Sequence, residues 1–156
     1  MKDFLAYRDE AVRQMRLADH MLTMTYPLLK DPKILLSVLQ NIFSALSNAV
    51  SAVLYQELYY KRIPHFNDSF ESRFNALKAH VVKKYNIDLK TVRLIAELRE
   101  LLNEHERASV EFSRKGKLFM ARDDYIMRSL SPEDLKRYLK KGKEATHDLL
   151  RLVIVK

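Results

Sequence analysis

Apolar residues recur along most of this chain at intervals of three and four positions, which places them on one face of a helix. This spacing predicts helices over residues 2–26, 32–61, 69–85, 88–107 and 132–153. Proline ends or opens helices, so we expect Pro27 and Pro32 to separate the first two. The expected fold is all-α, an up-and-down bundle of about five helices that forms a single domain over residues 1–156.

Capping residues mark the helix boundaries. Asp68 with Glu71 three positions later fits a capping box, and Asp88 is placed to cap the next helix. Between them, Asn86 is a suitable left-handed residue to stop the chain. The strongest signal is Ser131, which precedes a proline and two acids and therefore predicts the start of the last helix.

The second predicted helix carries no charge from Ile34 to Gln56, and its length alone would let it span a membrane. Its many Ser, Asn and Gln side chains argue against lipid, so we expect a central helix covered by its neighbours and no membrane insertion. Polar positions form one stripe along it, which fits either the interior of the domain or the seam of a homodimer. The stripe comprises Ser37, Asn41, Ser44, Asn48, Ser51 and Tyr55.

Residues 109–130 break the helical pattern. Val110 and Phe112 alternate with polar neighbours, and the basic segment that follows contains Gly116, as in a turn. We therefore expect a short β-hairpin or an irregular insert near residues 110–128.

The formal net charge is +8, and most of the excess lies in residues 114–156. Such a basic surface either binds nucleic acid or an acidic partner, or contacts only solvent. For the first case we take RNA as the predicted partner. The candidate nucleic-acid-binding residues are Arg107, Arg114, Lys115 and Lys117.

Composition excludes several kinds of site. With two glycines and no cysteine, the chain has no glycine-rich phosphate loop, no nucleophile elbow and no thiolate zinc site. A di-iron bundle needs two Glu-x-x-His pairs, and only Glu144 with His147 fits. Asp123 and Asp124 are adjacent acids without further ligands in sequence. We expect no metal and no cofactor, and, because an apolar leader is missing, a cytoplasmic location.

Two Arg–His pairs are candidate chemistry on RNA, Arg73 with His80 and Arg99 with His105. A histidine can move protons at the ribose hydroxyl or the leaving oxygen, and an arginine can hold the phosphate. Residues six apart lie about 120° from each other on a straight helix. Arg99 and His105 therefore converge only if the helix bends or ends, or if a second subunit supplies one of them.

The order of elements resembles that in the HEPN family (higher eukaryotes and prokaryotes nucleotide-binding), in particular a prokaryotic branch of this family. Residues 44–50 resemble the family's second helix, and residues 136–150 resemble its closing helix. Glu97 to His105 resembles its Arg-x(4–6)-His motif helix. The resemblance implies a metal-independent ribonuclease, usually with the site formed across a homodimer. In that case the catalytic residues would be Arg99, which would hold phosphate, and His105, which would transfer the proton.

Other members of this family lack activity and serve as binding modules. Glu100 follows the arginine here, where active members often carry a small polar residue, and its charge would oppose phosphate. A non-catalytic module for a nucleotide or a nucleotidyltransferase-type protein partner therefore stays open. A helical interaction protein without small-molecule chemistry is the third alternative.

Overall fold

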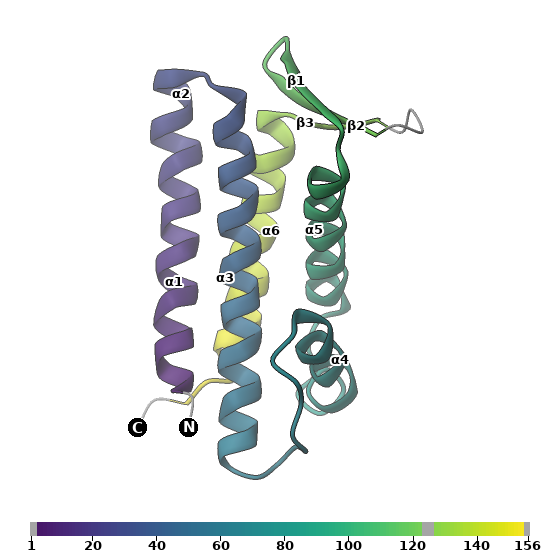
Figure 1. Ribbon diagram of the computed structural model, residues 1–156. Coiled ribbons are helices and arrows are strands. Elements are labelled where there is room, and N and C mark those ends of the chain that lie inside the picture. Colours follow the sequence, from purple (N-terminus) through teal and green to yellow (C-terminus); the bar gives the residue numbers. More distant parts are fainter. Residues whose placement is uncertain (1–2, 123–126, 155–156) are drawn as a thin grey trace.

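The computed structural model describes residues 3–122 and 127–154 and is mainly helical (Figure 1). Within these residues, five helices have eleven residues or more, and three short strands form one antiparallel sheet. The helices are α1 (Phe4–His20), the π turn η1 (Met21–Thr25), α2 (Tyr26–Leu29), α3 (Pro32–Tyr59), α4 (Phe70–His80), α5 (Leu89–Arg107) and α6 (Pro132–Leu150). The strands are β1 (Val110–Arg114), β2 (Lys117–Ala121) and β3 (Met127–Leu130). The prediction of a mainly helical fold with a short insert is thus confirmed, and the insert is a three-stranded sheet rather than a hairpin alone.

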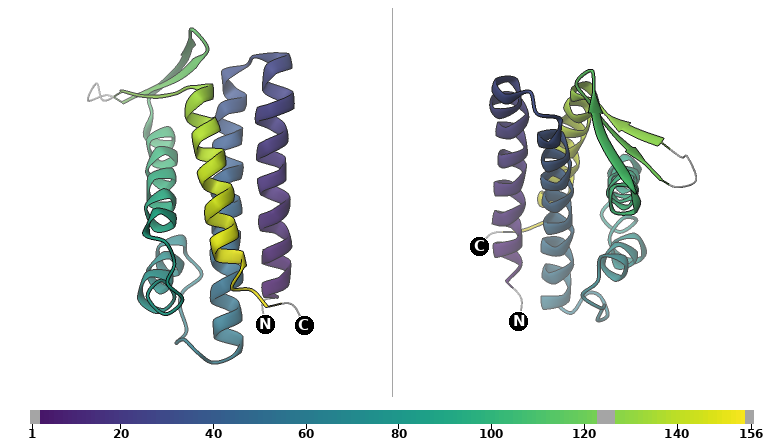
Figure 2. Two further views of the ribbon diagram at one scale, coloured as in Figure 1. Left: turned by 180° about the vertical axis from the view of Figure 1, so that it is seen from behind. Right: turned by 45° about the horizontal axis from the view of Figure 1, so that its top comes forward.

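Helix α3, which carries no charge from Ile34 to Gln56, lies at the centre, with α1 on one side, α6 behind and α4 and α5 on the other (Figures 1 and 2). Its side chains Leu35, Ile42, Leu46 and Leu54 are fully buried. Among the described residues it is also the one helix long and apolar enough to cross a membrane, and half of that apolar window is buried against neighbouring helices. The prediction of a covered central helix is therefore confirmed.

The polar stripe of α3 contacts η1 and α1 at two of its positions, Asn41 and Tyr55. The Asn41 amide donates a hydrogen bond to the sulfur of Met21 at 3.3 Å. The Tyr55 ring stacks on that of Tyr7 in α1, with the centroids 5.3 Å apart. Of the two places predicted for the stripe, the structure supports the interior for these residues.

The first helix does not end at Pro27. It widens into the π turn, where the Tyr26 N–H bonds to the carbonyl of Met21, five residues back, and it then continues to Leu29. A proline ring collides with the carbonyl four residues earlier in a regular α-helix, and the wider turn gives this ring room. The prediction that Pro27 ends the helix is therefore wrong.

The N-cap of helix α4 lies one residue after the predicted cap. The Ser69 hydroxyl accepts the hydrogen bond from the Ser72 N–H at 3.1 Å. Asp68 was the predicted cap, but its carboxylate accepts from the Tyr55 hydroxyl at 2.9 Å instead. The helix ends at His80 rather than near residue 85, because the following residues form turns.

Three other boundary signals are confirmed. Asn86 adopts the left-handed conformation with φ 54°, and the Asp88 side chain caps α5 through the Lys90 N–H. Ser131 and Asp134 form a complete capping box at the start of α6.

The adjacent acids Asp123 and Asp124 lie outside the described residues.

Helices α1, α3 and α6 approach closely where α6 carries a glycine. A Cβ atom on Gly142 would lie 2.9 Å from the Ile42 side chain and 3.3 Å from that of Met15. Because 2.9 Å is shorter than real Cβ contacts, a larger residue here would force the Ile42 side chain to shift in this close-packed region.

The sheet stands at one end of the helices and is continuous with two of them, because β1 follows α5 and β3 leads into α6 (Figure 1). Strands β1 and β2 are joined by a two-residue turn, Lys115 and Gly116, with φ of 53° and 76°. Positive φ at both positions is what a type I′ hairpin turn requires. The inner face of the sheet joins the core through Leu118, Met120 and Leu130.

Candidate nucleic-acid interface

The outer face of the sheet carries a pair of stacked aromatic rings. Leu118 and Met120 point into the core, so their neighbours Lys117 and Phe119 point outward. Phe112 lies directly opposite Phe119. The two rings are 5.2 Å apart between centroids and inclined by 11°, and Phe112 is 40% exposed. Each ring therefore covers part of one face of the other, and Phe112 is the ring of the pair that is open to solvent.

The next row of the same face is basic. Arg114 lies directly opposite Lys117, and Lys115 occupies the turn beside them. Among residues 3–122 and 127–154, none of these three cations has an ion-pair partner. Like charges placed opposite each other destabilise a hairpin, so the row gains stability only when an anion binds between them. The predicted basic turn is thus brought next to the aromatic pair.

Arg107, the fourth candidate, is placed elsewhere. It is the last residue of α5 and is exposed. It lies before β1, whereas the other three cations lie at the far end of that strand. We therefore leave Arg107 out of the interface defined by Phe112, Phe119, Arg114, Lys115 and Lys117, which we call the sheet platform.

His105 contacts the sheet from below. Its Nδ1 pairs with the carboxylate of Glu111, a β1 residue whose side chain lies on the inner face. This contact fixes the orientation of β1 relative to the last turns of α5.

Arg99 points to a different part of the molecule. Its guanidinium lies over the Phe70 ring at 5.0 Å, and its Nε is 3.9 Å from a carboxylate oxygen of Glu71. Both partners belong to the first turn of α4. Arg99 and His105 share no contact partner in the part of the chain that the structure describes.

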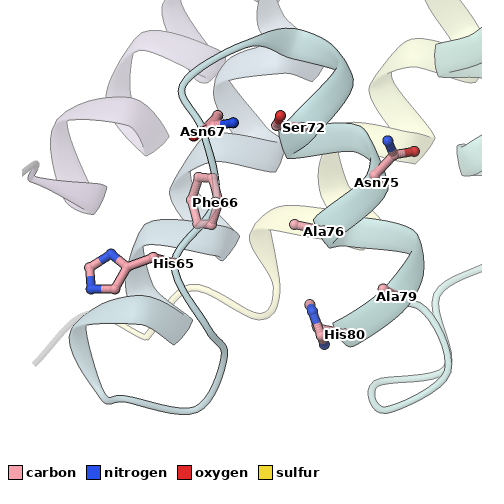
Figure 3. Close-up of a pocket in the computed structure, with 8 residues that line it drawn as sticks. All are labelled: His65, Phe66, Asn67, Ser72, Asn75, Ala76, Ala79 and His80. Atoms are coloured by element: carbon pink, nitrogen blue, oxygen red, sulfur yellow. The ribbon is translucent and has the colours of Figure 1, made fainter.

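A separate hollow of about 430 Å³ lies beside α4. Figure 3 shows loop residues on one side and helix residues on the other, and His65 and His80 come from these two sides. Arg73, the predicted partner of His80, does not line it, because its guanidinium turns to Asp68 at 3.5 Å. The lining residues are His65, Phe66, Asn67, Ser72, Asn75, Ala76, Ala79 and His80. Their side chains bring no lysine, arginine or carboxylate, so the hollow suits a neutral polar molecule better than a phosphate.

No family model, no curated protein and no solved structure matches this chain. The likeness to the HEPN family therefore stays a prediction from the motif residues.

The aromatic half of the sheet platform was not predicted from the sequence. Phe119 stands in the apolar run 118–120, which offers no helical or alternating pattern of its own. The signal that could have found it is the turn, because a two-residue loop at residues 115–116 pairs Arg114 with Lys117 and hence Phe112 with Phe119.

Proposed function

We propose that this protein binds single-stranded nucleic acid, with RNA as the expected form, on the sheet platform. Bases would stack on Phe112 and Phe119, and backbone phosphates would lie against Arg114, Lys115 and Lys117. The observation that carries the proposal is a stacked aromatic pair with Phe112 exposed, directly beside cations that have no ion-pair partner among residues 3–122 and 127–154.

The two halves of the platform suit an unpaired strand. Stacking on an aromatic side chain contributes about 1–3 kcal/mol per base and needs a base face that a duplex keeps covered. Phosphate contacts release counterions, and each one adds about 0.7 to the slope of log affinity against log salt for a single strand. Binding by the platform should therefore depend on both ring contact and ionic strength.

The test is fluorescence anisotropy with an end-labelled RNA of roughly 12 nucleotides, a length typical of single-strand-binding modules, measured between about 50 and 200 mM salt. Phe112→Leu keeps an apolar residue on the strand but removes the ring, and we expect about a tenfold loss of affinity with an unchanged salt slope. Lys115→Asn keeps a residue that accepts positive φ, and we expect a smaller slope.

Lys83→Gln is the matched charge control. Lys83 is exposed in the turns after α4, away from the sheet, and its loss should leave affinity and slope unchanged. The proposal fails if the wild-type protein does not bind at low salt, or if Phe112→Leu and Lys115→Asn both behave as the wild type does. DNA of the same sequence and a duplex serve as the comparison ligands.

Cleavage of RNA by Arg99 and His105 is a separate prediction, because Arg99 contacts α4 whereas His105 contacts β1. With the RNA incubated in a chelator, we expect intact strand to be recovered. Fragments that disappear in His105→Ala would instead support the HEPN-type ribonuclease. The HEPN-like hypothesis includes three further predictions, which are an up-and-down topology, a nucleotidyltransferase-type partner and a cytoplasmic location.

A further inference from the structure

Strand β1 forms one edge of the sheet, and no described residue pairs with its outer backbone groups. The turn at residues 115–116 makes Arg114 and Lys117 a hydrogen-bonded pair, and hydrogen-bonded pairs recur at every second residue of an antiparallel ladder. The N–H and C=O groups of Glu111 and Ser113 therefore point to the open edge. No backbone group of the described residues bonds to them there.

The open edge is accessible. All five residues of β1 are exposed, including Val110 at 54% and Phe112 at 40%. Glu111 and Ser113 lie on the inner face of the sheet and are nevertheless exposed, although the Glu111 carboxylate contacts His105 of α5. The strand contains no proline and keeps an unbroken register with β2, and such an edge is a template for another strand.

We infer that β1 pairs with β1 of a second copy of this chain, antiparallel and about a two-fold axis at Phe112. Glu111 then faces the partner subunit's Ser113 in both directions, which satisfies all the free N–H and C=O groups on the two edges. Phe112 faces the partner subunit's Phe112, and Val110 faces the partner subunit's Arg114. No like charges stand directly opposite each other.

Registers shifted by two residues pair the two β1 strands less favourably. A shift of two residues one way places Glu111 opposite the partner subunit's Glu111, which is a like-charge pair. A shift the other way sets Glu111 opposite the partner subunit's Lys115, a turn residue that offers no strand partner. The self-complementarity of this five-residue strand therefore favours a second copy over an unrelated peptide.

The consequence of this pairing rests on the proposed function. Two sheet platforms become one six-stranded surface, with four phenylalanines in a row at its centre. Because the strands are antiparallel, the two basic turns lie at opposite ends of that surface. A strand of nucleic acid crossing the row would meet cations on both sides, so the dimer should prefer a longer ligand than one copy alone does.

The first test is sedimentation velocity over a concentration series with Ser113→Pro and its control Ser113→Thr. Proline removes an N–H that points to the open edge and leaves the bonds from β1 to β2 intact, whereas threonine keeps that N–H. We expect the wild type and Ser113→Thr to shift toward dimer as concentration rises, and Ser113→Pro to stay monomeric with an unchanged far-ultraviolet spectrum.

A second test uses the absence of cysteine from the sequence. Directly opposite residues in a pair without hydrogen bonds have Cα atoms about 4.5 Å apart, within the range that a disulfide spans. Phe112→Cys should therefore form a disulfide-linked dimer under mild oxidation. Val110 faces the partner subunit's Arg114, four residues from the partner subunit's Val110. Val110→Cys should therefore form far less of the disulfide-linked dimer.

A wild-type protein that is monomeric at every concentration, together with equal crosslinking of the two cysteine variants, would overturn the dimer. That outcome leaves the proposed function standing if the monomer still binds the short RNA. If the wild type dimerises but neither it nor Ser113→Pro binds RNA, the dimer stands and the proposed function fails.

Discussion

At the scale of single residues, Glu57 in the last turns of α3 is a carboxylate with only 1% of its side chain exposed. It accepts hydrogen bonds from the Tyr85 hydroxyl at 2.5 Å, Arg62 at 3.0 Å and Lys84 at 3.3 Å. Burial acts to raise the pKa of Glu57, but these hydrogen bonds outweigh it and hold the pKa below its usual value. One carboxylate thus ties the end of α3 to the turns that follow α4.

Glu57 should make the fold sensitive to acid. Its pKa is lower in the folded chain than the ordinary value of 4.5. Its stabilisation is therefore complete above about pH 4.5 and is lost as pH falls through the folded pKa. Glu57→Gln should cost about 3 kcal/mol of unfolding free energy at neutral pH. The difference from wild type should shrink below pH 4.5 in urea unfolding.

Glu100→Gln is the matched control for this titration. Glu100 is exposed on α5 and forms no ion pair with any residue of the described ranges. Its replacement should change the unfolding free energy by less than about 0.5 kcal/mol at any pH. A gap between wild type and Glu57→Gln that stays constant down to pH 3 would contradict the role given to the buried carboxylate.

At the scale of elements, the β1–β2 hairpin depends on two left-handed residues in its turn. Gly116 has φ 76°, and a Cβ atom there would meet only the Tyr26 hydroxyl at 4.0 Å. Space is therefore available, and a substitution would cost only backbone strain. Lys115, with φ 53°, already carries such strain.

Opposite changes in hairpin stability are expected from these two positions. Gly116→Ala should destabilise the hairpin by about 1 kcal/mol, and Lys115→Asn should stabilise it slightly because asparagine tolerates positive φ. Amide hydrogen exchange of β1 and β2 measures both effects. Equal protection in the two variants would show that the backbone conformation at these two turn positions does not control the stability of the hairpin.

The elements differ in how far the sequence predicts them. Local patterns predict the caps Ser131 and Asp88, the central helix with its uncharged stretch from Ile34 to Gln56, and the basic turn, and the structure confirms them. The cap of α4 does not, because Ser69 and Asp68 are equally good candidates until Tyr55 approaches across the fold. The partners of Arg99 and His105 also come from other elements, so spacing within α5 could not reveal them.

At the scale of the whole molecule, Gln56 ties the end of the described chain to the central helix. Its amide donates to the Leu152 carbonyl at 2.7 Å and accepts from the Ile154 N–H at 2.8 Å. The side chain is 2% exposed. The segment after α6 is thus held to α3 by one buried residue that satisfies both its donor and its acceptor.

Gln56→Met should release that segment. Methionine has a similar shape but leaves the Leu152 carbonyl and the Ile154 N–H without their partners, at a cost of about 2 kcal/mol. We expect lower thermal stability and faster amide exchange at Ile154. Gln40→Met, an exposed position on the same helix, should have neither effect; if both variants behave alike, the two hydrogen bonds are not what holds the segment.

The π turn of the first helix has a consequence for chain length. It holds one residue more than a regular turn, and Met24 within it and Leu28 and Leu29 beyond it are exposed at 56%, 83% and 67%. An added residue rotates everything after it by about 100° around the axis, which moves apolar positions off the buried face. Deleting one residue within 21–25 would turn them back, but it would also restore the regular turn in which the Pro27 ring collides with a carbonyl, so the length of this segment is tied to that proline.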